Sequence, residues 1–475
     1  MHIPTRLGVK TFSQIDQDLF AKMSGDANPM HVDAIAARRT QAGAPVVHGV
    51  HALLWSLDLL IKLQSDRKIS DIAMRFERFI YVEEQVEAVL IEAASGTSII
   101  ELRTDGTRAA VATLGSATER SLESPLITAA AHRISIPLLR DVEDLRGLTG
   151  AFFLANDHGK LEHAFPDLTR ALGAETVRSI AGLSTLVGME CPGLLSIFSK
   201  LRVELGRVDM EGQPTLRYSV RRLQALLRST VIDVQAPGLT GSVEAFVRQP
   251  PITQPSMENL RTTISGNLTK NDHVLIVGGS RGIGELTAKL VSLGGARVTI
   301  TYARGENEAQ SVAREIKSTG GKCDVMRLDV SESIAEQMSL PSSPFTHCYY
   351  FATPPIFRKR GLAFDRTTLD SFITFYIEAF HELSELLLSR NPQARIFTPS
   401  TSAIDERPAG SLEYVTSKLG TERLAEDMSR RHPKARIITS RFPRILTDQT
   451  ATVLPVRSED PLSILVPLIH SLHEK

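Results

Sequence analysis

The sequence predicts a multidomain protein that combines α+β and α/β architecture, and three observations lead to this prediction. The chain has 475 residues, which is enough for two or three domains that each bury a core. In its first third, a long apolar helical pattern precedes several segments that alternate apolar and polar residues as strands do. In its last third, a glycine-rich turn is followed by alternating apolar strands and helices, the pattern of a doubly wound parallel sheet.

Charge and cysteine usage narrow the class of protein. Lys plus Arg and Asp plus Glu number 54 each, so no net charge favours nucleic acid or an anionic membrane as a partner. The three cysteines, Cys191, Cys323 and Cys348, have no CxxC spacing, which fits a reducing compartment better than secretion. The N-terminus lacks an apolar signal core, and no run approaches the ~18 apolar residues of a membrane span. We therefore expect a soluble, cytoplasmic protein.

The first third begins with a helix that runs into a proline-containing loop. Apolar residues at helical spacing predict a short helix over Thr11–Met23, followed by the segment Gly25–His31. Because Pro29 biases the residue before it toward extended geometry, this segment is expected to be an irregular loop. Such a loop could aim Asp26 and His31 at one point, as an acid/base pair for moving protons on and off water. The alternative is a turn in which Asp26 caps a helix and His31 is polar surface.

A second motif and a set of strands complete the first third. Val47-His48-Gly49 opens an apolar helix that is expected to end near Leu63. Strand-like segments separated by polar or glycine turns follow it: Met74–Phe76, Val86–Glu92, Ser98–Leu102 and Ala109–Leu114. A long apolar helix followed by antiparallel strands indicates a sheet wrapped around a helix.

The loop and the start of this helix together resemble one enzyme family. Ser24-Gly25-Asp26-x-Asn28-Pro29-x-His31-x-Asp33, followed by Pro45-Val46-Val47-His48-Gly49, is similar to the (R)-specific enoyl-thioester hydratases, the MaoC-like family with a hotdog fold. The resemblance implies that Asp26 and His31 hold and activate the water that adds across the C2–C3 double bond of an enoyl thioester. It implies that the same pair also catalyses the reverse dehydration.

The resemblance gives other residues of this region expected roles. Asn28 is expected to support the loop and to contact substrate. Backbone N–H groups near Gly49 lie at a helix N-terminus, where they could polarise the thioester carbonyl and stabilise an enolate. His48 and His51 are more often structural at such a site, and we expect a structural role for both.

The middle third, from about residue 130 to 250, is interpreted as a second copy of this layout without the acid/base loop. The polar stretch Ser121–Pro125 separates the two. Helices are expected over Phe165–Leu172 and Ala174–Val187, and Cys191–Leu195 is taken to parallel the His48-Gly49 stretch at the head of another apolar helix, Leu194–Leu201. Strands are expected at Arg202–Arg207, Thr215–Val220, Leu227–Val234 and Gly241–Val247.

This second unit has no counterpart of the Gly-Asp-x-Asn-Pro-x-His loop, so it is expected to be catalytically silent. Its expected task is to pair with the first sheet and to shape the acyl tunnel between them. An unrelated α+β domain is the alternative, because the repeat is seen only in layout.

The last third is expected to bind a dinucleotide. Proline-rich segments mark a linker, with a new domain from Met257, and His273–Val277 reads as a buried parallel strand. The turn Gly278–Gly284 then opens a helix to Leu293, and its glycines allow a tight turn and close approach of the cofactor, whose pyrophosphate would lie on the helix N–H groups. Further strands are expected at Val298–Tyr302, Cys323–Leu328, Thr346–Phe351, Ala394–Thr398 and Ala435–Arg441.

A Tyr-x-x-x-Lys sequence makes the prediction for this domain more specific. Tyr414 and Lys418 lie one helical turn apart, and a nearby ammonium is expected to lower the pKa of the phenol so that it can donate a proton to a carbonyl as hydride arrives. With the glycine turn, the region from about 270 to 448 resembles the short-chain dehydrogenase/reductases. By that resemblance the catalytic hydroxyl falls on Thr401, with Ser400 and Ser402 as neighbours that remain open.

The same resemblance assigns the cofactor-binding residues. They are Gly278, Ser280, Arg281, Gly282, Ile283 and Gly284 in the turn, and Asp329 and Val330 as the adenine-contacting pair. The second strand ends without an acidic residue for a ribose hydroxyl, and Arg304 and Arg281 instead indicate a 2′-phosphate, hence NADP(H). The alternative for each arginine is an ordinary surface charge.

Three positions depart from the family pattern. Phe351-Ala352-Thr353-Pro354 replaces Asn-Asn-Ala-Gly, Tyr376 replaces the asparagine of the long helix, and Pro443-Arg444 replaces Pro-Gly. The first two put the family's proton-relay water and nicotinamide wall in doubt.

Taken together, the sequence predicts an N-terminal double hotdog followed by a Rossmann-type doubly wound parallel sheet, with domains at 1–120, 121–250 and 257–475. The leading hypothesis is a bifunctional enzyme that reduces a 3-ketoacyl thioester with NADPH and dehydrates the 3-hydroxyacyl product to the 2-enoyl thioester. The substrate would be carried on acyl-carrier protein or coenzyme A, and we expect a homodimer or higher homo-oligomer, no metal, no nucleic acid and no membrane.

Two alternatives remain open. In one, the reductase acts on another ketone, such as a sugar or a polyketide intermediate. In the other, the C-terminal domain is a degenerate nucleotide-binding or assembly module.

Overall fold

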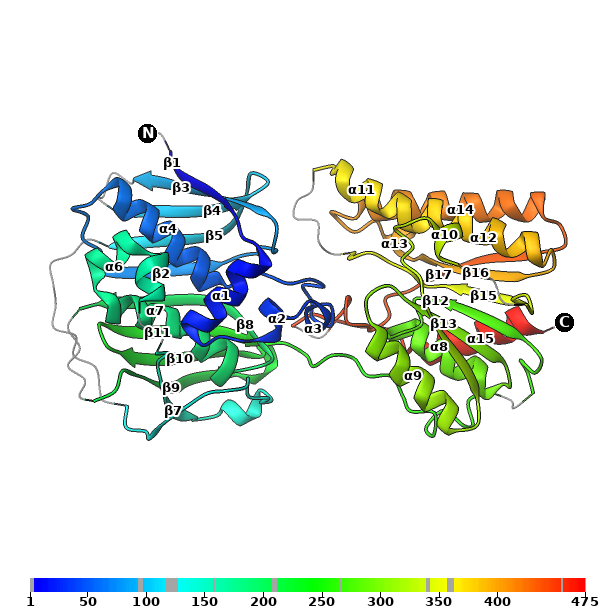
Figure 1. The fold of residues 1–475 in the computed structure, drawn as a ribbon, viewed down its shortest axis with the longest axis horizontal. Helices are drawn as coiled ribbons and strands as arrows, with labels where there is room; N and C mark the ends of the chain where they lie inside the picture. The colour runs from blue at the N-terminus through cyan, green and yellow to red at the C-terminus, as the bar shows by residue number, and fades with distance from the viewer. Residues whose placement is uncertain are drawn as a thin grey trace. The chain divides into compact units, whose positions relative to one another are not determined.

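The computed structural model forms two compact units (Figure 1). It describes residues 4–92, 97–115, 127–156, 159–206, 212–264, 267–338, 342–356, 363–453 and 456–474. The first unit comprises Met1–Pro250 with Thr452–Pro455, and the second comprises Pro251–Ala451 with Val456–Lys475. The expected separator Ser121–Pro125 lies outside the described residues. Within the described part of the chain, no helix has both the length and the apolar character needed to cross a membrane.

The first unit is built on one eleven-stranded sheet. Its strands are β1 (Thr5–Thr11), β2 (Asp71–Phe76), β3 (Gln85–Glu92), β4 (Ser98–Thr104), β5 (Thr107–Gly115), β6 (Ala131–His132), β7 (Thr149–Phe153), β8 (Ser196–Leu205), β9 (Thr215–Gln224), β10 (Ser229–Ala236) and β11 (Leu239–Val247). Their order is β1-β3-β4-β5-β2-β8-β11-β10-β9-β7-β6. Apart from β6 at the edge, this order is two five-stranded sets that mirror each other about the antiparallel β2–β8 pair.

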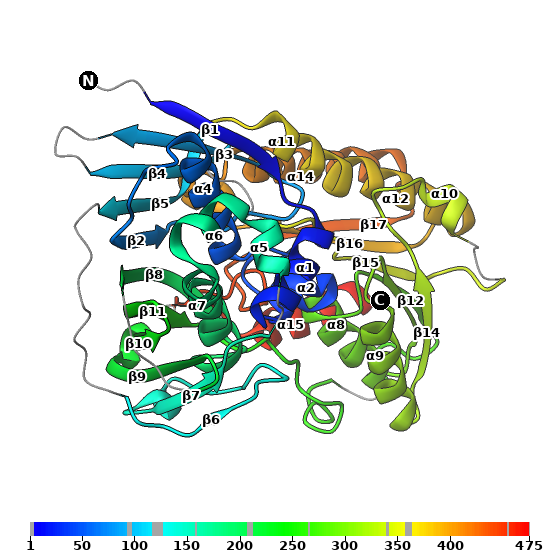
Figure 2. The same ribbon diagram turned by 60° about the vertical axis from the view of Figure 1, so that its left-hand side comes forward.

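Two helices provide the core beneath this sheet. The helices of the first unit are α1 (Gln14–Ser24), α2 (Pro29–Val32), α3 (Ala34–Ala37), α4 (Gly49–Leu63), α5 (Lys160–Ala164), α6 (Pro166–Leu172) and α7 (Ala174–Thr185). The long helices α4 and α7 lie along the same face of the sheet (Figures 1 and 2). Leu53, Leu57 and Leu60 of α4 and Ile180 and Leu183 of α7 are fully buried in one hydrophobic cluster that spans both strand sets.

The structure confirms most of the predicted elements of this unit and corrects two. The predicted helix Leu194–Leu201 is wrong, because Ser196–Leu205 forms β8, whose burial alternates along much of its length and which pairs with β2 and β11. The helix that occupies the position of α4 in the second strand set is α7, which ends in a π-helical turn, Leu186–Glu190, before this strand. The sequence analysis also missed β1, β6 and β7.

The second correction concerns the Gly25–His31 loop. The chain does leave the helical conformation at Gly25, which adopts φ 88° at the end of α1. It does not remain irregular, because Pro29 occupies the first position of the one-turn helix α2 and Asn28 caps it. His31 therefore projects from a short helix rather than from a loop.

The second unit contains a six-stranded parallel sheet, as predicted. Its strands are β12 (His273–Val277), β13 (Arg297–Tyr302), β14 (Lys322–Arg327), β15 (His347–Tyr350), β16 (Arg395–Thr401) and β17 (Arg436–Phe442), in the order β14-β13-β12-β15-β16-β17. Its helices are α8 (Gly282–Leu293), α9 (Glu306–Ser318), α10 (Ile334–Gln337), α11 (Arg366–Ile373), α12 (Ala379–Arg390), α13 (Ala403–Glu406), α14 (Leu412–Arg431) and α15 (Pro461–His473).

Helices cover both faces of this sheet, which gives two cores. Val274 and Ile276 of β12 pack in a cluster with α8, α9 and α15. Leu275 and Val277 of the same strand pack in the other cluster, with α10, α12 and α14. The two-residue period of a strand thus divides one apolar run between two layers of helices.

Candidate functional site

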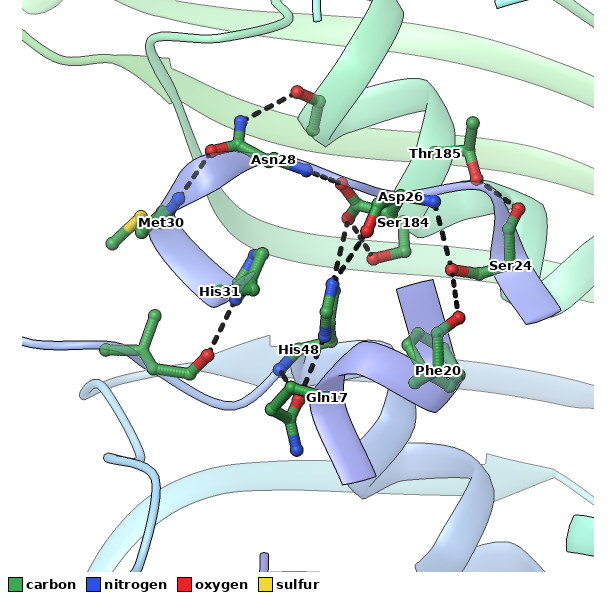
Figure 3. A network of polar contacts seen from close by, with 12 residues as sticks. Gln17, Phe20, Ser24, Asp26, Asn28, Met30, His31, His48, Ser184 and Thr185 are labelled. Atoms are coloured by element: carbon green, nitrogen blue, oxygen red, sulfur yellow. Dashed lines mark hydrogen bonds and ion pairs between the residues drawn. The ribbon is translucent and has the colours of Figure 1, made fainter. Parts of the chain in front are cut away.

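The predicted acid/base pair lies where α1 and α2 approach the start of α4 (Figure 3). Asp26 and His31 come together with His48, such that one polar atom of each lies within 4.8 Å of the others. The side chain of Asn28 caps α2 by accepting from the N–H of Met30 at 3.0 Å. The structure therefore brings together the two residues that the sequence analysis singled out, from positions five residues apart.

Asp26 is a buried carboxylate, with 1% of the residue exposed. The Ser184 hydroxyl donates to its Oδ2 at 2.6 Å, and the Asn28 N–H donates to its Oδ1 at 3.1 Å. Burial raises the pKa of Asp26, while the nearby His31 and these two donors partly oppose the rise. A carboxyl group whose pKa is raised in this way holds its proton to a higher pH than a free carboxyl group does, which suits a group that gives and takes protons.

His31 is oriented by a backbone carbonyl. Its Nδ1 lies 2.8 Å from the carbonyl oxygen of Val46, which can only accept a hydrogen bond, so Nδ1 carries the hydrogen. In the neutral ring, Nε2 is then the unprotonated nitrogen. His31 can therefore act as a base through this second nitrogen.

His48, which was expected to be structural, belongs to the same cluster as the pair. Its ring stacks on that of His31, with centroids 3.8 Å apart and planes 25° apart. Its Nδ1 lies 2.9 Å from Oε1 of Gln17, and its Nε2 lies 3.0 Å from the carbonyl oxygen of Asp26. Burial lowers the pKa of His48 well below its usual value. These contacts make His48 a support for the backbone of Asp26, which fits the structural role.

The stacking of the two imidazoles makes this cluster a poor metal site. A metal ion binds an imidazole nitrogen in the plane of the ring. With centroids 3.8 Å apart and planes only 25° from parallel, one nearby ion cannot lie in the planes of both His31 and His48. The arrangement fits proton transfer better than metal coordination.

The second strand set supplies the surroundings of Asp26, which the sequence analysis did not foresee. Ser184 lies near the end of α7, and Gly188 lies in the π-helical turn that follows. A Cβ atom at Gly188 would lie 2.7 Å from Cγ of Asp26, so only glycine leaves room for the carboxylate. The Gly188 carbonyl also accepts from Nδ2 of Asn28 at 2.7 Å. No motif marks these residues, because their role arises from contacts across about 160 positions of the chain.

An apolar pocket of about 80 Å³ adjoins the pair. Apart from the acid/base residues it is lined mainly by apolar side chains, including Met74, Phe76, Leu102, Ala110 and Val187. Gly49, at the N-terminus of α4, also lines it, and a Cβ there would lie 2.9 Å from Cζ of the Phe76 ring. Helix N–H groups facing an apolar pocket are suited to stabilise negative charge on a bound carbonyl oxygen.

Asn28 lines the same pocket, but its amide is engaged by the protein. Its Oδ1 caps α2 and its Nδ2 donates to Gly188. The geometry therefore favours the predicted supporting role of Asn28 over the predicted contact with substrate.

In the second unit, the glycine turn between β12 and α8 fits a dinucleotide. Gly278 and Gly282 have φ of 77° and 59°, and a Cβ at Gly284 would lie 2.9 Å from the carbonyl carbon of Gly278. No side chain of the described residues caps α8, which leaves the N–H groups of its first turn for an anion. Ser280 and Ile283 lie in this turn and at the start of α8, as predicted.

The remaining predicted cofactor residues differ in their surroundings. Arg281 is paired with Asp448, with Nη1 3.2 Å from the carboxylate, whereas Arg304 is exposed after β13. Arg304 is thus the better candidate for a 2′-phosphate. After β14, the carboxylate of Asp329 accepts from the N–H of Ser331 at 3.1 Å, and Val330 is buried.

Tyr414 and Lys418 lie one turn apart on α14, as predicted, but their electrostatics differ from the prediction. Burial raises the pKa of Tyr414, partly opposed by a hydrogen bond with Thr401. Burial also lowers the pKa of Lys418 to about 7. Its Nζ donates to the carbonyl of Pro399 at 2.8 Å and lies 3.7 Å from the ring centroid of Tyr376. A desolvated amine of this kind is a weak source of positive charge, so the expected lowering of the phenol pKa does not arise.

The structure distinguishes the three hydroxyl residues that were left open. Thr401 is the one that hydrogen-bonds to Tyr414. The Ser400 hydroxyl donates to Glu422 at 2.5 Å instead, and Ser402 precedes the short helix α13. Thr401 is therefore the candidate catalytic hydroxyl.

Two of the three departures from the family pattern contact each other. The hydroxyl of Tyr376 lies 2.5 Å from Oγ1 of Thr353, and both come from positions that hold asparagine or alanine in the pattern. Tyr376 is buried, and its ring is the face on which Lys418 rests.

Comparison with known families matches both units. Residues 4–107 match the MaoC like domain, and residues 272–340 match the short chain dehydrogenase model. The homologue YusS of Bacillus subtilis, named as a short-chain dehydrogenase/reductase homologue, is 30% identical over 77 residues, which are 16% of this chain and 71% of that protein. The uncharacterized oxidoreductase YgfF of Escherichia coli is 41% identical over 58 residues, which are 12% of this chain and only 24% of that protein's length.

Solved structures similar to part of this chain include a doubly substituted short-chain dehydrogenase/reductase from Serratia marcescens. It is 18% identical, with a TM-score of 0.38, and the match covers 43% of this chain and 91% of that chain. Another is the alternative dihydrofolate reductase 1, FolM, from Brucella canis in complex with NADP, at 16% identity and a TM-score of 0.37, covering 44% of this chain and 90% of that chain.

Replacing Gly188 by alanine should strongly reduce turnover at the first site. The added Cβ overlaps the carboxylate of Asp26 and must displace it. Because a displacement of about 1 Å in an acid/base group costs roughly a hundredfold in rate, we expect a loss of that order in the hydration of a short enoyl thioester. Gly182→Ala, in α7, is the control, because its Cβ meets only the flexible end of Leu154. Wild-type turnover by Gly188→Ala would show that the reaction does not use Asp26 in this position.

Replacing Ser184 by alanine should move the pH profile. The Ser184 hydroxyl lowers the pKa of Asp26, so its loss raises that pKa further while burial stays. Hydration of an enoyl thioester uses the ionised carboxylate, so the acid limb of activity should move to higher pH. Ser179→Ala is the matched control, because Ser179 is also buried in α7 and its hydroxyl has no hydrogen-bond partner among the described residues. An unchanged acid limb in Ser184→Ala would mean that Asp26 does not control it.

Thr401→Val should impair the second site selectively. Valine keeps the shape of threonine but removes the hydroxyl that bonds Tyr414, and we expect ketone-dependent NADPH oxidation to fall about a hundredfold. Thr401→Ser should retain most of the activity, and Ser402→Ala should stay within a few-fold of wild type. If Ser402→Ala is the variant that loses turnover, the choice among the three hydroxyls is wrong.

Proposed function

We propose that this protein is a bifunctional acyl-thioester enzyme. Two findings support the proposal: the chain belongs to the short-chain dehydrogenase/reductases through its second unit, and its first unit carries a MaoC-like dehydratase domain. The second unit reduces a 3-ketoacyl thioester to the 3-hydroxyacyl thioester with NADPH. The first unit removes water to give the 2-enoyl thioester, or adds it in reverse. The observation that carries the proposal is the pair formed by the buried Asp26 and the half-buried His31, both of which line an apolar pocket.

In the proposed dehydration, each member of the pair transfers one proton. Nε2 of His31 takes a proton from C2 of the 3-hydroxyacyl thioester, while Asp26, whose pKa is raised by burial, gives its proton to the leaving hydroxyl at C3. The C2–C3 double bond forms, and water leaves. The pair is left as an imidazolium beside a carboxylate, and transfer of the proton from His31 to Asp26 restores the starting state.

The negative charge that develops on the thioester oxygen needs its own donors. Gly49, at the start of α4, lines the pocket, and no side chain in the described part of the chain caps this helix, so its first N–H groups are the candidate donors. The hydroxyl of Ser184 and the N–H of Asn28 hold the Asp26 carboxylate in place through the reaction. Hydration is the same sequence reversed, with the ionised Asp26 taking the proton of water.

The reductase step uses the residues of α14 and β16. A bound nicotinamide cofactor supplies hydride to the ketone carbon. Tyr414 donates the proton to the ketone oxygen, and Thr401 orients the phenol through their hydrogen bond. Lys418 is held by Pro399 and by the ring of Tyr376. The exposed Arg304 favours NADPH over NADH.

The two reactions are consecutive, since the product of the reductase is the substrate of the dehydratase. Fusing them in one chain keeps the 3-hydroxyacyl intermediate on the same protein. The thioester would be carried by acyl-carrier protein or coenzyme A.

A second candidate function follows from the departures in the reductase unit. Tyr376 and Thr353 stand where the family pattern has asparagine and alanine, and they bond to each other. On this basis the second unit either reduces another class of ketone or binds NADPH without turnover. NADPH oxidation with a panel of ketones, together with NADPH binding by fluorescence, separates these two from the leading proposal.

Asp26→Asn should stop the proposed sequence at the 3-hydroxyacyl thioester. Asparagine cannot deliver a proton, so a 3-ketoacyl thioester with equimolar NADPH should accumulate the hydroxy product, while wild type yields enoyl thioester detected by mass spectrometry. Tyr414→Phe should instead leave the ketoacyl substrate unreacted. Asp33→Asn is the matched control, because Asp33 is an exposed cap of α3 outside the pocket and asparagine can also cap. Undiminished enoyl formation by Asp26→Asn would refute the assignment of the pair.

A further inference from the structure

One charged side chain of the apolar pocket is not used by the proposed mechanism. The pocket lining includes three ionisable side chains, which are Asp26, His31 and Arg78. The first two form the acid/base pair. Arg78 is exposed, and it lies after the end of β2, beside Phe79. A guanidinium in an otherwise apolar lining can bind a charged part of a ligand.

The pocket lining has a buried apolar part and an exposed part that includes Arg78. Met74, Leu102 and Ala110, which also line it, are buried and come from β2, β4 and β5. An acyl chain is apolar and fits the end formed by these side chains. The remainder of a thioester substrate then has to leave past the exposed part of the lining, where Arg78 lies.

The surroundings of Arg78 leave its guanidinium available. The neighbouring acid, Glu77, is engaged by Arg75 at 2.6 Å and by Arg108 at 2.9 Å. Arg78 itself donates only its backbone N–H, to the carbonyl of Ala109 at 3.0 Å. Among the residues that the structure describes, none forms an ion pair or a side-chain hydrogen bond with the guanidinium of Arg78. The nearest carboxylate in sequence is therefore already neutralised by two other arginines.

We infer that Arg78 binds the phosphate of a phosphopantetheine arm, and that this contact selects carrier-linked acyl thioesters for the dehydratase site. The inference rests on the proposed function and adds the group that the site recognises outside the acyl chain. A guanidinium offers two parallel N–H groups to a phosphate, which gives both charge and geometry. The phosphopantetheine arm is common to coenzyme A and to acyl-carrier protein, so one residue serves either source.

The test compares substrates with and without the phosphate. A short enoyl group is presented as its phosphopantetheine thioester and as its N-acetylcysteamine thioester, which has the same reacting atoms but no phosphate. Wild type, Arg78→Ala, Arg78→Lys and the control Arg75→Ala are assayed for hydration. Arg75 lies on β2, three residues before Arg78, and is also exposed, but it is paired with Glu77 and does not line the pocket.

We expect Arg78→Ala to raise KM for the phosphopantetheine thioester about tenfold, the size of one charge-assisted hydrogen-bonded contact near solvent, with kcat little changed. Its KM for the N-acetylcysteamine thioester should stay within twofold of wild type. For the phosphopantetheine thioester, the KM of Arg78→Lys should lie between those of wild type and Arg78→Ala, and the KM of Arg75→Ala should match wild type. The difference in KM between wild type and Arg78→Ala should shrink at high salt. Equal effects on both thioesters would overturn the inference. An effect that appears only with acyl groups bearing a distal carboxylate would also overturn it, since Arg78 would then bind the acyl chain.

Two further experiments distinguish the two carriers from each other, and the inference about Arg78 from the proposed function. Enoyl thioesters of coenzyme A and of an acyl-carrier protein show which carrier benefits from Arg78. Calorimetric titration with free phosphopantetheine measures the contact without turnover, and loss of this binding in Arg78→Ala supports the inference even if hydration fails. If wild type hydrates the N-acetylcysteamine thioester and Asp26→Asn does not, the proposed function is upheld independently of Arg78. Phosphopantetheine binding that is the same in wild type and Arg78→Ala would overturn only the inference about Arg78.

Discussion

The burial of the Asp26 carboxylate is the constraint on which the first unit depends. Removing an ionisable group from water costs several kcal/mol unless polar groups replace the water. Here the replacement comes from both strand sets: the Asn28 N–H from the first and the Ser184 hydroxyl from the second. Gly188 adds the space that any other residue would fill. A fragment that ends after β5 would lack Ser184 and Gly188, which surround this carboxylate. The two strand sets therefore form a single functional unit.

The second unit handles a buried ionisable group in a different way. Lys418 has a carbonyl and an aromatic face as partners, and its pKa falls to about 7. In the first unit, burial raises the pKa of an acid, whereas in the second it lowers the pKa of a base. In both sites, desolvation moves the pKa of a side chain toward the pH at which proton transfer is efficient.

Local sequence predicted those features that depend on local physics. The end of the first helix near Gly25, the glycine turn at Gly278, the apolar helix α4 and the parallel strands follow from glycine and residue periodicity, and the structure contains them. The predicted helix at Leu194–Leu201 failed because a short apolar run fits helix and strand equally, and its pairing with β2 decides the matter. The roles of Ser184 and Gly188 could not be foreseen, because they depend on a contact between segments about 160 residues apart. Likewise, the buried state of Lys418 depends on the ring of Tyr376 from another helical segment.

The mirrored strand order of the first unit has a consequence for stoichiometry. The sheet is duplicated, yet the acid/base segment occurs once, since the second set meets it with a hydroxyl and a glycine. An assembly of two identical single-copy units would carry two equivalent centres, whereas this chain carries one. On the proposed function, each polypeptide then has one dehydratase centre for one reductase centre. The two centres are then present in equal numbers, whatever the level of expression.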